Sequence, residues 1–145
     1  MFDPEEDVFL VSNAGNGMIS RLDAARGIVL SNLSLEGGPK HLDRAPDGTV
    51  AAGLAEEGAV ALVADDAAAG SLEIGGTLHG VRIGADAIAV AATERDMVVR
   101  VDWETDEPLE RSPGPAPYHV AQGAPGLLVS SSAAPQLWRL NPVTP

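Results

Sequence analysis

The chain has 145 residues, enough for one ordinary domain with a buried core, and it contains no cysteine. The lack of cysteine excludes a disulfide framework, thiol catalysis and a cysteine-based metal site. The formal net charge is −12 at pH 7, and Lys40 is the single lysine. Nucleic acid and anionic membrane surfaces would be repelled, so neither is expected as a partner.

The first six residues, MFDPEE, are acidic where a secretory signal peptide would be basic. No run approaches the about 18 apolar residues of a membrane-spanning helix. As it stands, the sequence therefore predicts a cytoplasmic protein. The composition is 45% hydrophobic, but much of this is Ala and Val, and small side chains favour closely stacked sheets.

The first segment, residues 1–37, reads as three short strands. Val8–Asn13 is a continuous apolar run, as expected of a strand buried on both faces. The Asn and Gly residues at 13–17 favour a hairpin into Met18–Asp23. Ile28–Leu35 alternates between apolar and polar residues, which is typical of an outer strand with one wet face. Residues 2–7 match the turn at residues 44–48 of the second segment. In the second segment that turn follows the inner strand, so the first segment is expected to lack its inner strand.

The second segment, residues 38–76, contains four strand patterns separated by turn residues. The Ala-rich run at 65–69 has some helical propensity, but the repeat places a hairpin there and Gly70 ends it. The expected strands are Lys40–Ala45, Thr49–Leu54, Ala59–Ala64 and Ser71–Ile74.

The third and fourth segments, residues 77–115 and 116–145, copy the same unit. A shift of about 39 residues places Arg100-Val101-Asp102 on Arg139-Leu140-Asn141. The four segments are expected to contain three, four, four and three strands, and the sequence shows no helical periodicity. Short antiparallel strands repeated at this period are typical of propeller blades. The prediction is an all-β partial β-propeller of about four antiparallel blades, with the first and last incomplete.

An open array of blades leaves sheet edges and apolar faces bare. Closed propellers have about four to eight blades of four strands each. The chain is therefore expected either to be part of a larger propeller with further blades, or to close the ring by pairing with a second copy.

Several short stretches resemble the YVTN-type propeller repeat: Phe9–Asn13, Ile19–Asp23, Gly38-Pro39 and Ala45-Pro46-Asp47-Gly48. The chain is also similar to gluconolactonase-like propellers, whose repeats often contain Phe-Asp-Pro, as this chain does at Phe2-Asp3-Pro4. In those proteins, metal-binding residues usually include Asn-Asp at the start of an inner strand. This chain has Lys40-His41 at the matching position, so the metal set of that family does not carry over.

The candidate site residues lie at the starts of the expected inner strands, which ring the mouth of a propeller channel. They are Lys40, His41, His79, Tyr118 and His119. Such groups can contact a ligand, line the channel wall, or, as imidazoles, converge on a metal. Because blades separate equivalent positions, His41 and His119 are expected two blades apart, and no metal site is predicted.

Arginine recurs at one position of three repeats, and an Asp or Asn follows it by two residues. We expect the arginines to contact neighbouring acidic loops and the Asp or Asn side chains to cap the next turn. The arginines are Arg21, Arg100 and Arg139, and the capping residues are Asp23, Asp102 and Asn141.

No residue is predicted to be catalytic, because the serines at 130–132 have no neighbouring base and no nucleophile elbow. The sequence predicts a non-catalytic repeat module that binds or scaffolds a protein or small ligand at the channel mouth, without a cofactor. The alternative is a fragment of a metal-dependent gluconolactonase-like hydrolase or lyase propeller, which would need a divalent metal.

Overall fold

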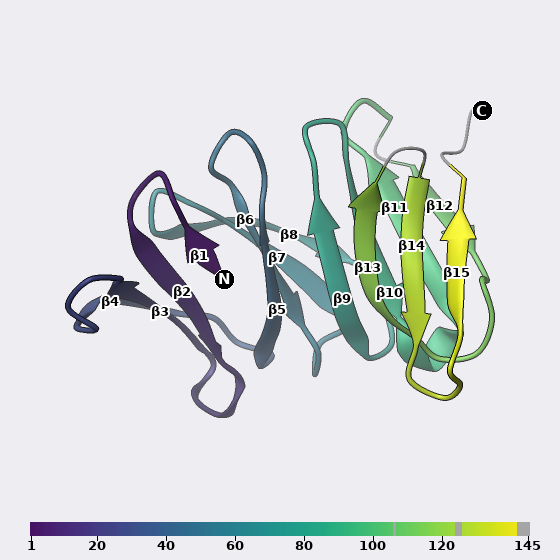
Figure 1. Ribbon diagram of the computed structural model, residues 1–145, viewed down its shortest axis with the longest axis horizontal. Coiled ribbons are helices and arrows are strands. Elements are labelled where there is room, and N and C mark those ends of the chain that lie inside the picture. The colour runs from purple at the N-terminus through teal and green to yellow at the C-terminus, as the bar shows by residue number, and fades with distance from the viewer. Residues whose placement is uncertain (106, 124–125, 142–145) are drawn as a thin grey trace.

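The computed structural model describes residues 1–105, 107–123 and 126–141, and they form four antiparallel sheets (Figure 1). Strand order in every sheet follows chain order. Two short 3₁₀ turns, η1 (Ala14–Asn16) and η2 (Thr93–Arg95), join the second and third strands of their sheets. The prediction of an all-β chain with blades of three to four strands is confirmed.

The strands of the first two sheets are β1 (Phe2–Asp3), β2 (Val8–Asn13), β3 (Met18–Asp23) and β4 (Val29–Ser34), then β5 (Pro39–Arg44), β6 (Val50–Leu54), β7 (Ala59–Ala64) and β8 (Ala67–Glu73). Those of the last two are β9 (Leu78–Ile83), β10 (Ala87–Ala92), β11 (Met97–Asp102) and β12 (Pro108–Arg111), then β13 (Pro117–Gly123), β14 (Gly126–Ser131) and β15 (Leu137–Leu140). None of the helical turns in the described ranges has the length or apolar character needed to cross a membrane.

Two details differ from the sequence prediction. The first sheet does have an inner strand: β1, only two residues long, pairs Phe2 with Phe9. The strand β8 begins at Ala67, four residues earlier than expected, because Asp65 and Asp66 alone make the turn. Both have positive φ (50° and 57°), which suits a two-residue hairpin. In the described residues the fourth sheet has three strands, and residues 142–145 lie outside that range.

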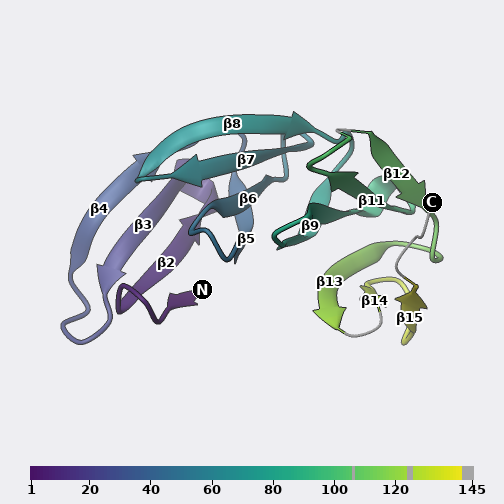
Figure 2. The ribbon, with the colours of Figure 1, turned by 90° about the horizontal axis from the view of Figure 1, so that it is seen from above.

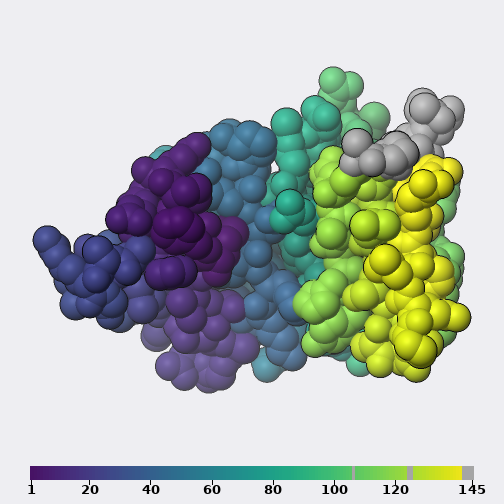
Figure 3. Space-filling view, in the orientation of Figure 1, coloured from purple at the N-terminus to yellow at the C-terminus, as the bar shows by residue number. Residues whose placement is uncertain are grey.

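The sheets follow one another along an arc, and the first and fourth lie toward opposite ends of the molecule (Figures 2 and 3). Apolar side chains fill the first two interfaces. The second and third sheets share a cluster of twelve buried residues that includes Val60, Leu78 and Ile88. Nine more, including Leu10 and Ile19, lie between the first and second. Many of the others are alanines, which lets the sheets stack closely.

Charged side chains join consecutive sheets. The Asp43 carboxylate on β5, which is 8% exposed, accepts hydrogen bonds from the Arg82 guanidinium and the Ile83 amide, both at 2.7 Å. In the same way, Arg44 contacts Asp3 of the first sheet at 2.9 Å. These bonds satisfy buried polar groups that would otherwise destabilise the interface.

Of the three predicted arginine contacts with neighbouring acidic loops, the one at Arg21 is observed, because Arg21 contacts Glu6 and Asp66. Arg100 instead contacts Asp102, the last residue of its own strand, at 3.1 Å. For Arg139 the contact stays a prediction.

The predicted turn caps are also confirmed where they are described. Asp23 accepts a hydrogen bond from the Arg26 amide at 2.7 Å, and Asp102 accepts one from the Glu104 amide at 3.1 Å. The turn after Asn141 lies outside the described residues.

Candidate functional site

The structure brings the candidate site residues together. The ring of His41 on β5 lies 5.2 Å from that of His119 on β13 and 6.1 Å from that of His79 on β9, measured between centroids. The ring of Tyr118 contacts two of these histidines, with its centroid 4.3 Å from that of His79 and 4.7 Å from that of His119. We call these four rings, together with Lys40, the histidine cluster. The expectation that the blades would hold His41 and His119 apart was wrong, because their sheets converge at the inner strands.

A glycine on β9 makes this convergence possible. A Cβ atom at Gly80 would lie 2.6 Å from both the Tyr118 carbonyl oxygen and the Val120 amide nitrogen. No larger residue fits such a gap without displacing backbone. Gly80 therefore lets β13 lie directly against β9, which places Tyr118 beside His79.

A chain of hydrogen bonds fixes the orientation and tautomer of His79. The Thr93 hydroxyl, just after β10, donates to the Pro117 carbonyl at 2.6 Å. The same hydroxyl oxygen lies 2.9 Å from His79 Nδ1. Because the hydroxyl hydrogen points to Pro117, the hydroxyl oxygen accepts, and Nδ1 must carry the hydrogen. In the neutral ring, Nε2 is then left as an acceptor.

The surroundings keep His41 and His79 neutral near pH 7. Burial lowers the pKa of His41 below its ordinary 6.5, and the charges of His119, His79 and Lys40 lower it further. The pKa of His79 is also lowered, first by burial and then by the charges of Lys40 and His119, while Glu94 opposes the shift. A protonated imidazole is disfavoured there because it would be both desolvated and next to a like charge.

Lys40 supplies the positive charge of the cluster. Its backbone is held by the Ser12 hydroxyl of the first sheet, which donates to the Lys40 carbonyl at 2.6 Å, and its residue is exposed. The cluster thus combines imidazole acceptors, a phenol ring and one ammonium group. It can accept hydrogen bonds, stack against a planar group and attract an anion.

The cluster does not match a metal centre. Within residues 1–105, 107–123 and 126–141, no three His, Asp or Glu side chains are arranged to hold a metal ion. His79 uses one ring nitrogen for Thr93. The residues present therefore do not fit the divalent metal that a gluconolactonase-like propeller would need.

Two residues of the site could not be singled out from the sequence. Thr93 lies in a loop between second and third strands, beside Glu94 and Arg95, where only charged residues draw attention. Gly80 matters only because another backbone lies against it. The one available sign was that Gly80 stands where the neighbouring repeats have His41 and His119.

No model of a protein family matches the sequence, and no curated protein matches it either. Solved structures do match in shape. Hydrazine synthase from Kuenenia stuttgartiensis gives a TM-score of 0.79 at 14% identity, over 97% of this chain and 48% of that one. A catalytically inactive histidine-to-alanine variant of virginiamycin B lyase from Staphylococcus aureus, with quinupristin, gives 0.81 at 15%, over 98% and 51%. The fold is that of a β-propeller.

The computationally designed Ika4 protein matches as well, with a TM-score of 0.72 at 15% identity, over 93% of this chain and 86% of that one. The chain spans about half the length of the two natural propellers just named. At these identities the likeness establishes the fold alone. The resemblances to YVTN-type repeats and to gluconolactonase-like propellers stay predictions.

Proposed function

We propose that the chain is a non-catalytic propeller module that binds a small polar ligand at the histidine cluster. The observation that carries this proposal is that three separate inner strands bring four rings to one place, where the charge of Lys40 also lowers the pKa of His41 and His79. Tyr118 and His79 stack on one another, with centroids 4.3 Å apart and planes tilted by 33°, so the pair offers one aromatic block for a planar group to lie against.

The chemical groups of the histidine cluster indicate which groups the ligand must carry. A neutral His79 has Nε2 as an acceptor, so the ligand needs a hydrogen-bond donor. Lys40 favours a negative charge or a strong acceptor at the edge of the ligand. We therefore infer a small planar molecule with both a donor and an acceptor or anionic group.

Nuclear magnetic resonance can test the site directly. The chain has three histidines and all belong to the cluster, so the histidine Cε1–H signals report on it alone. We expect planar polar fragments from a screening library to shift these signals in a saturable way, and Tyr118→Ala to weaken the effect. The substitution Trp103→Phe, on another interface, is the matched control. If fragments bind while the histidine signals stay fixed, the site lies elsewhere.

An enzymatic role is the second candidate, favoured by the likeness to a lyase whose solved form was inactivated at a histidine. It is tested by incubating the chain with quinupristin, and with a sugar lactone plus divalent metal, and following the masses of the products. Turnover that disappears in His79→Ala would replace the binding proposal. We expect no turnover, because the metal ligands of that alternative are not gathered in the described residues.

Partners that complete the ring form the last part of the proposal. The face of the first sheet turned away from its neighbour exposes Phe2, Phe9 and Val29, and the fourth sheet exposes Leu128 and Leu137. Apolar faces of this kind are usually covered. We infer that either further blades or a second copy of the chain packs on them.

Light scattering at low protein concentration separates the two occupants. Twice the mass of the chain indicates a second copy. A chain of single mass that precipitates or binds a hydrophobic dye indicates missing blades. A stable monomer that does neither contradicts both.

A further inference from the structure

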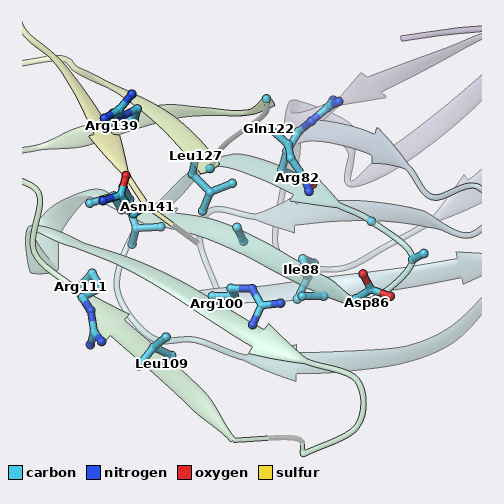
Figure 4. Close-up of a pocket in the computed structure, with 18 residues that line it drawn as sticks. Arg82, Asp86, Ile88, Arg100, Leu109, Arg111, Gln122, Leu127, Arg139 and Asn141 are labelled. Carbon is cyan, nitrogen blue, oxygen red and sulfur yellow. The ribbon is translucent and has the colours of Figure 1, made fainter. Parts of the chain in front are cut away.

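A second hollow lies between the third and fourth sheets, near the ends of their inner strands (Figure 4). No residue of the histidine cluster lines it. Its volume is about 940 Å³, within the range of small-molecule sites. Arg100, Arg111 and Leu109 lie on one side of it, and Leu127 and Asn141 on the other. We call this hollow the arginine cavity.

The pairing of the strands explains why arginines line one wall. Paired residues point to the same face of a sheet, and Ala89 on β10 is paired with Arg82 on one side and Arg100 on the other. Ala89 packs with Val120 of the fourth sheet, so this face is the one turned toward the cavity. Arg111 is paired with Val98 on the same face. Three guanidinium groups thus share one wall.

The opposite wall combines two leucines with the polar residues Gln122, Arg139 and Asn141. Leu127 of β14 and Leu140 of β15 are paired and lie on the same face of the fourth sheet as Val120 and Val129. Leu109 adds an apolar surface beside Arg100, with which it is paired. The cavity therefore has a side with three arginines and a side on which leucines offer an apolar contact.

The equivalent space between the first and second sheets also contains arginines, but there their positive charge is neutralised. That space, about 540 Å³, also contains two arginines, but each contacts two carboxylates. Arg21 contacts Glu6 and Asp66, and Arg44 contacts Asp3 and Glu5. The charges there are already neutralised by the protein.

Arginines of the arginine cavity have fewer partners among the residues that the structure describes. Arg82 contacts one carboxylate, Asp43, and Arg100 contacts one, Asp102. Arg111 donates to the backbone carbonyl of Glu110 at 3.0 Å. A guanidinium has five N–H donors, so most of the donors on this wall remain available to a ligand. In a chain of net charge −12, a cavity lined by four arginines and a single carboxylate, that of Asp86, points to an anion.

We propose that the arginine cavity binds an amphiphilic organic anion, with its carboxylate or phosphate on the arginine wall and its apolar body against the leucines. Arginine pairs with both head groups through two parallel hydrogen bonds, which is why it serves such recognition. The walls supply the two kinds of contact that this class of ligand needs. The site is separate from the histidine cluster and does not depend on the function proposed for it.

Isothermal titration calorimetry with decanoate and decyl phosphate tests the proposal on the whole chain. We expect each anion to bind in a 1:1 ratio, more weakly as salt is added, while decanol and inorganic phosphate alone bind far less. The double variant Arg100→Gln/Arg111→Gln should lower the affinity by about tenfold or more, since charge-assisted hydrogen bonds are lost. The tighter of the two anions identifies the head group.

Two further variants keep the test decisive. Arg26→Glu changes the net charge by the same two units on an exposed turn of the first sheet and should leave the affinity unchanged. Ala89→Leu keeps all the arginines but fills part of the cavity and should also weaken binding. The proposal is overturned if neither anion binds, if decanol binds equally well, or if the double variant and Arg26→Glu behave alike.

Discussion

The interface between the second and third sheets and the one between the third and fourth have the same strand framework but opposite contents. The first holds twelve buried residues, among them Leu78, Val60 and Ile88. Among the described residues, the second holds a smaller buried cluster, Ala89, Ala91 and Val120, beside a cavity of about 940 Å³. Close packing is thus not a property of the repeat itself.

Equivalent positions explain the difference. In the second sheet, Ala51 is paired with Leu62 across β6 and β7. In the third sheet, Ala89 is paired with Arg100 across β10 and β11. Leu62 packs against the core of the next interface, whereas Arg100 lines the arginine cavity. Arg21 occupies the corresponding position of the first sheet and also borders a cavity, although buried apolar residues pack beside it.

The largest expected effect is on the packed interface. Leu78→Ala should lower the free energy of unfolding by about 2–5 kcal/mol, because Leu78 is fully buried and its removal leaves a void. Leu127→Ala, on the cavity wall, should cost about 1 kcal/mol or less, because its neighbourhood is already open. Urea unfolding measures both. Equal losses would show that the two interfaces are equally packed.

A substitution at Gly80 tests whether the interface between the third and fourth sheets, despite its cavity, is closely packed where β9 meets β13. Gly80→Ala should destabilise the chain by about 2–3 kcal/mol, because the new Cβ meets the backbone of Tyr118 and Val120. It should also shift the histidine signals of the cluster. Gly70→Ala, where nothing lies within 4 Å, is the control and should change stability by about 0.5 kcal/mol or less. Unchanged stability in Gly80→Ala would mean that the strands can separate without cost.

Substituting leucine for Ala51 and for Ala89, which occupy equivalent positions in the second and third sheets, compares how tightly the two interfaces are packed. Ala51→Leu should cost about 1–2 kcal/mol, because Ala51 is fully buried in a filled interface. Ala89→Leu points toward the cavity and should cost less than about 1 kcal/mol. Thermal unfolding of the two variants gives the difference. A larger loss in Ala89→Leu would contradict the assignment of an open cavity.

The smallest expected effect is a pH dependence at the histidine cluster. The pKa values of His41 and His79 are lowered in the folded chain, so the unfolded chain binds more protons below its ordinary histidine value of 6.5. Their contribution to stability is present above that pH and is lost as the pH falls below it. The urea midpoint should therefore drop between pH 7 and 5.5. The variant His41→Gln/His79→Gln should show a flatter profile, and an identical profile would exclude this source.

The sequence predicted the strands and the sheets because short alternating runs recur every 39 residues or so. It also singled out Lys40, His41, His79, Tyr118 and His119 as candidate site residues, since they occupy equivalent positions of successive repeats, but not that their side chains meet. The distances within the cluster could not be predicted, because they depend on a contact between Gly80 and the backbone of β13. The arginine cavity was equally hidden, since Leu127 and Arg100 face each other only after two sheets have stacked. The start of β8 was misplaced because alanines around a two-residue turn carry little pattern.

Each sheet is built from strands that are consecutive in the chain, so its pairings join residues near one another in sequence. Contacts of short range form quickly and carry a low entropic cost. As the polypeptide leaves the ribosome, one hairpin after another can pair before the next has been translated. The first and second sheets can then be complete, with Arg44 bound to Asp3, while β13 is still unmade. Synthesis in this order would leave the face that carries Arg100 and Arg111 bare until β13, β14 and β15 have paired.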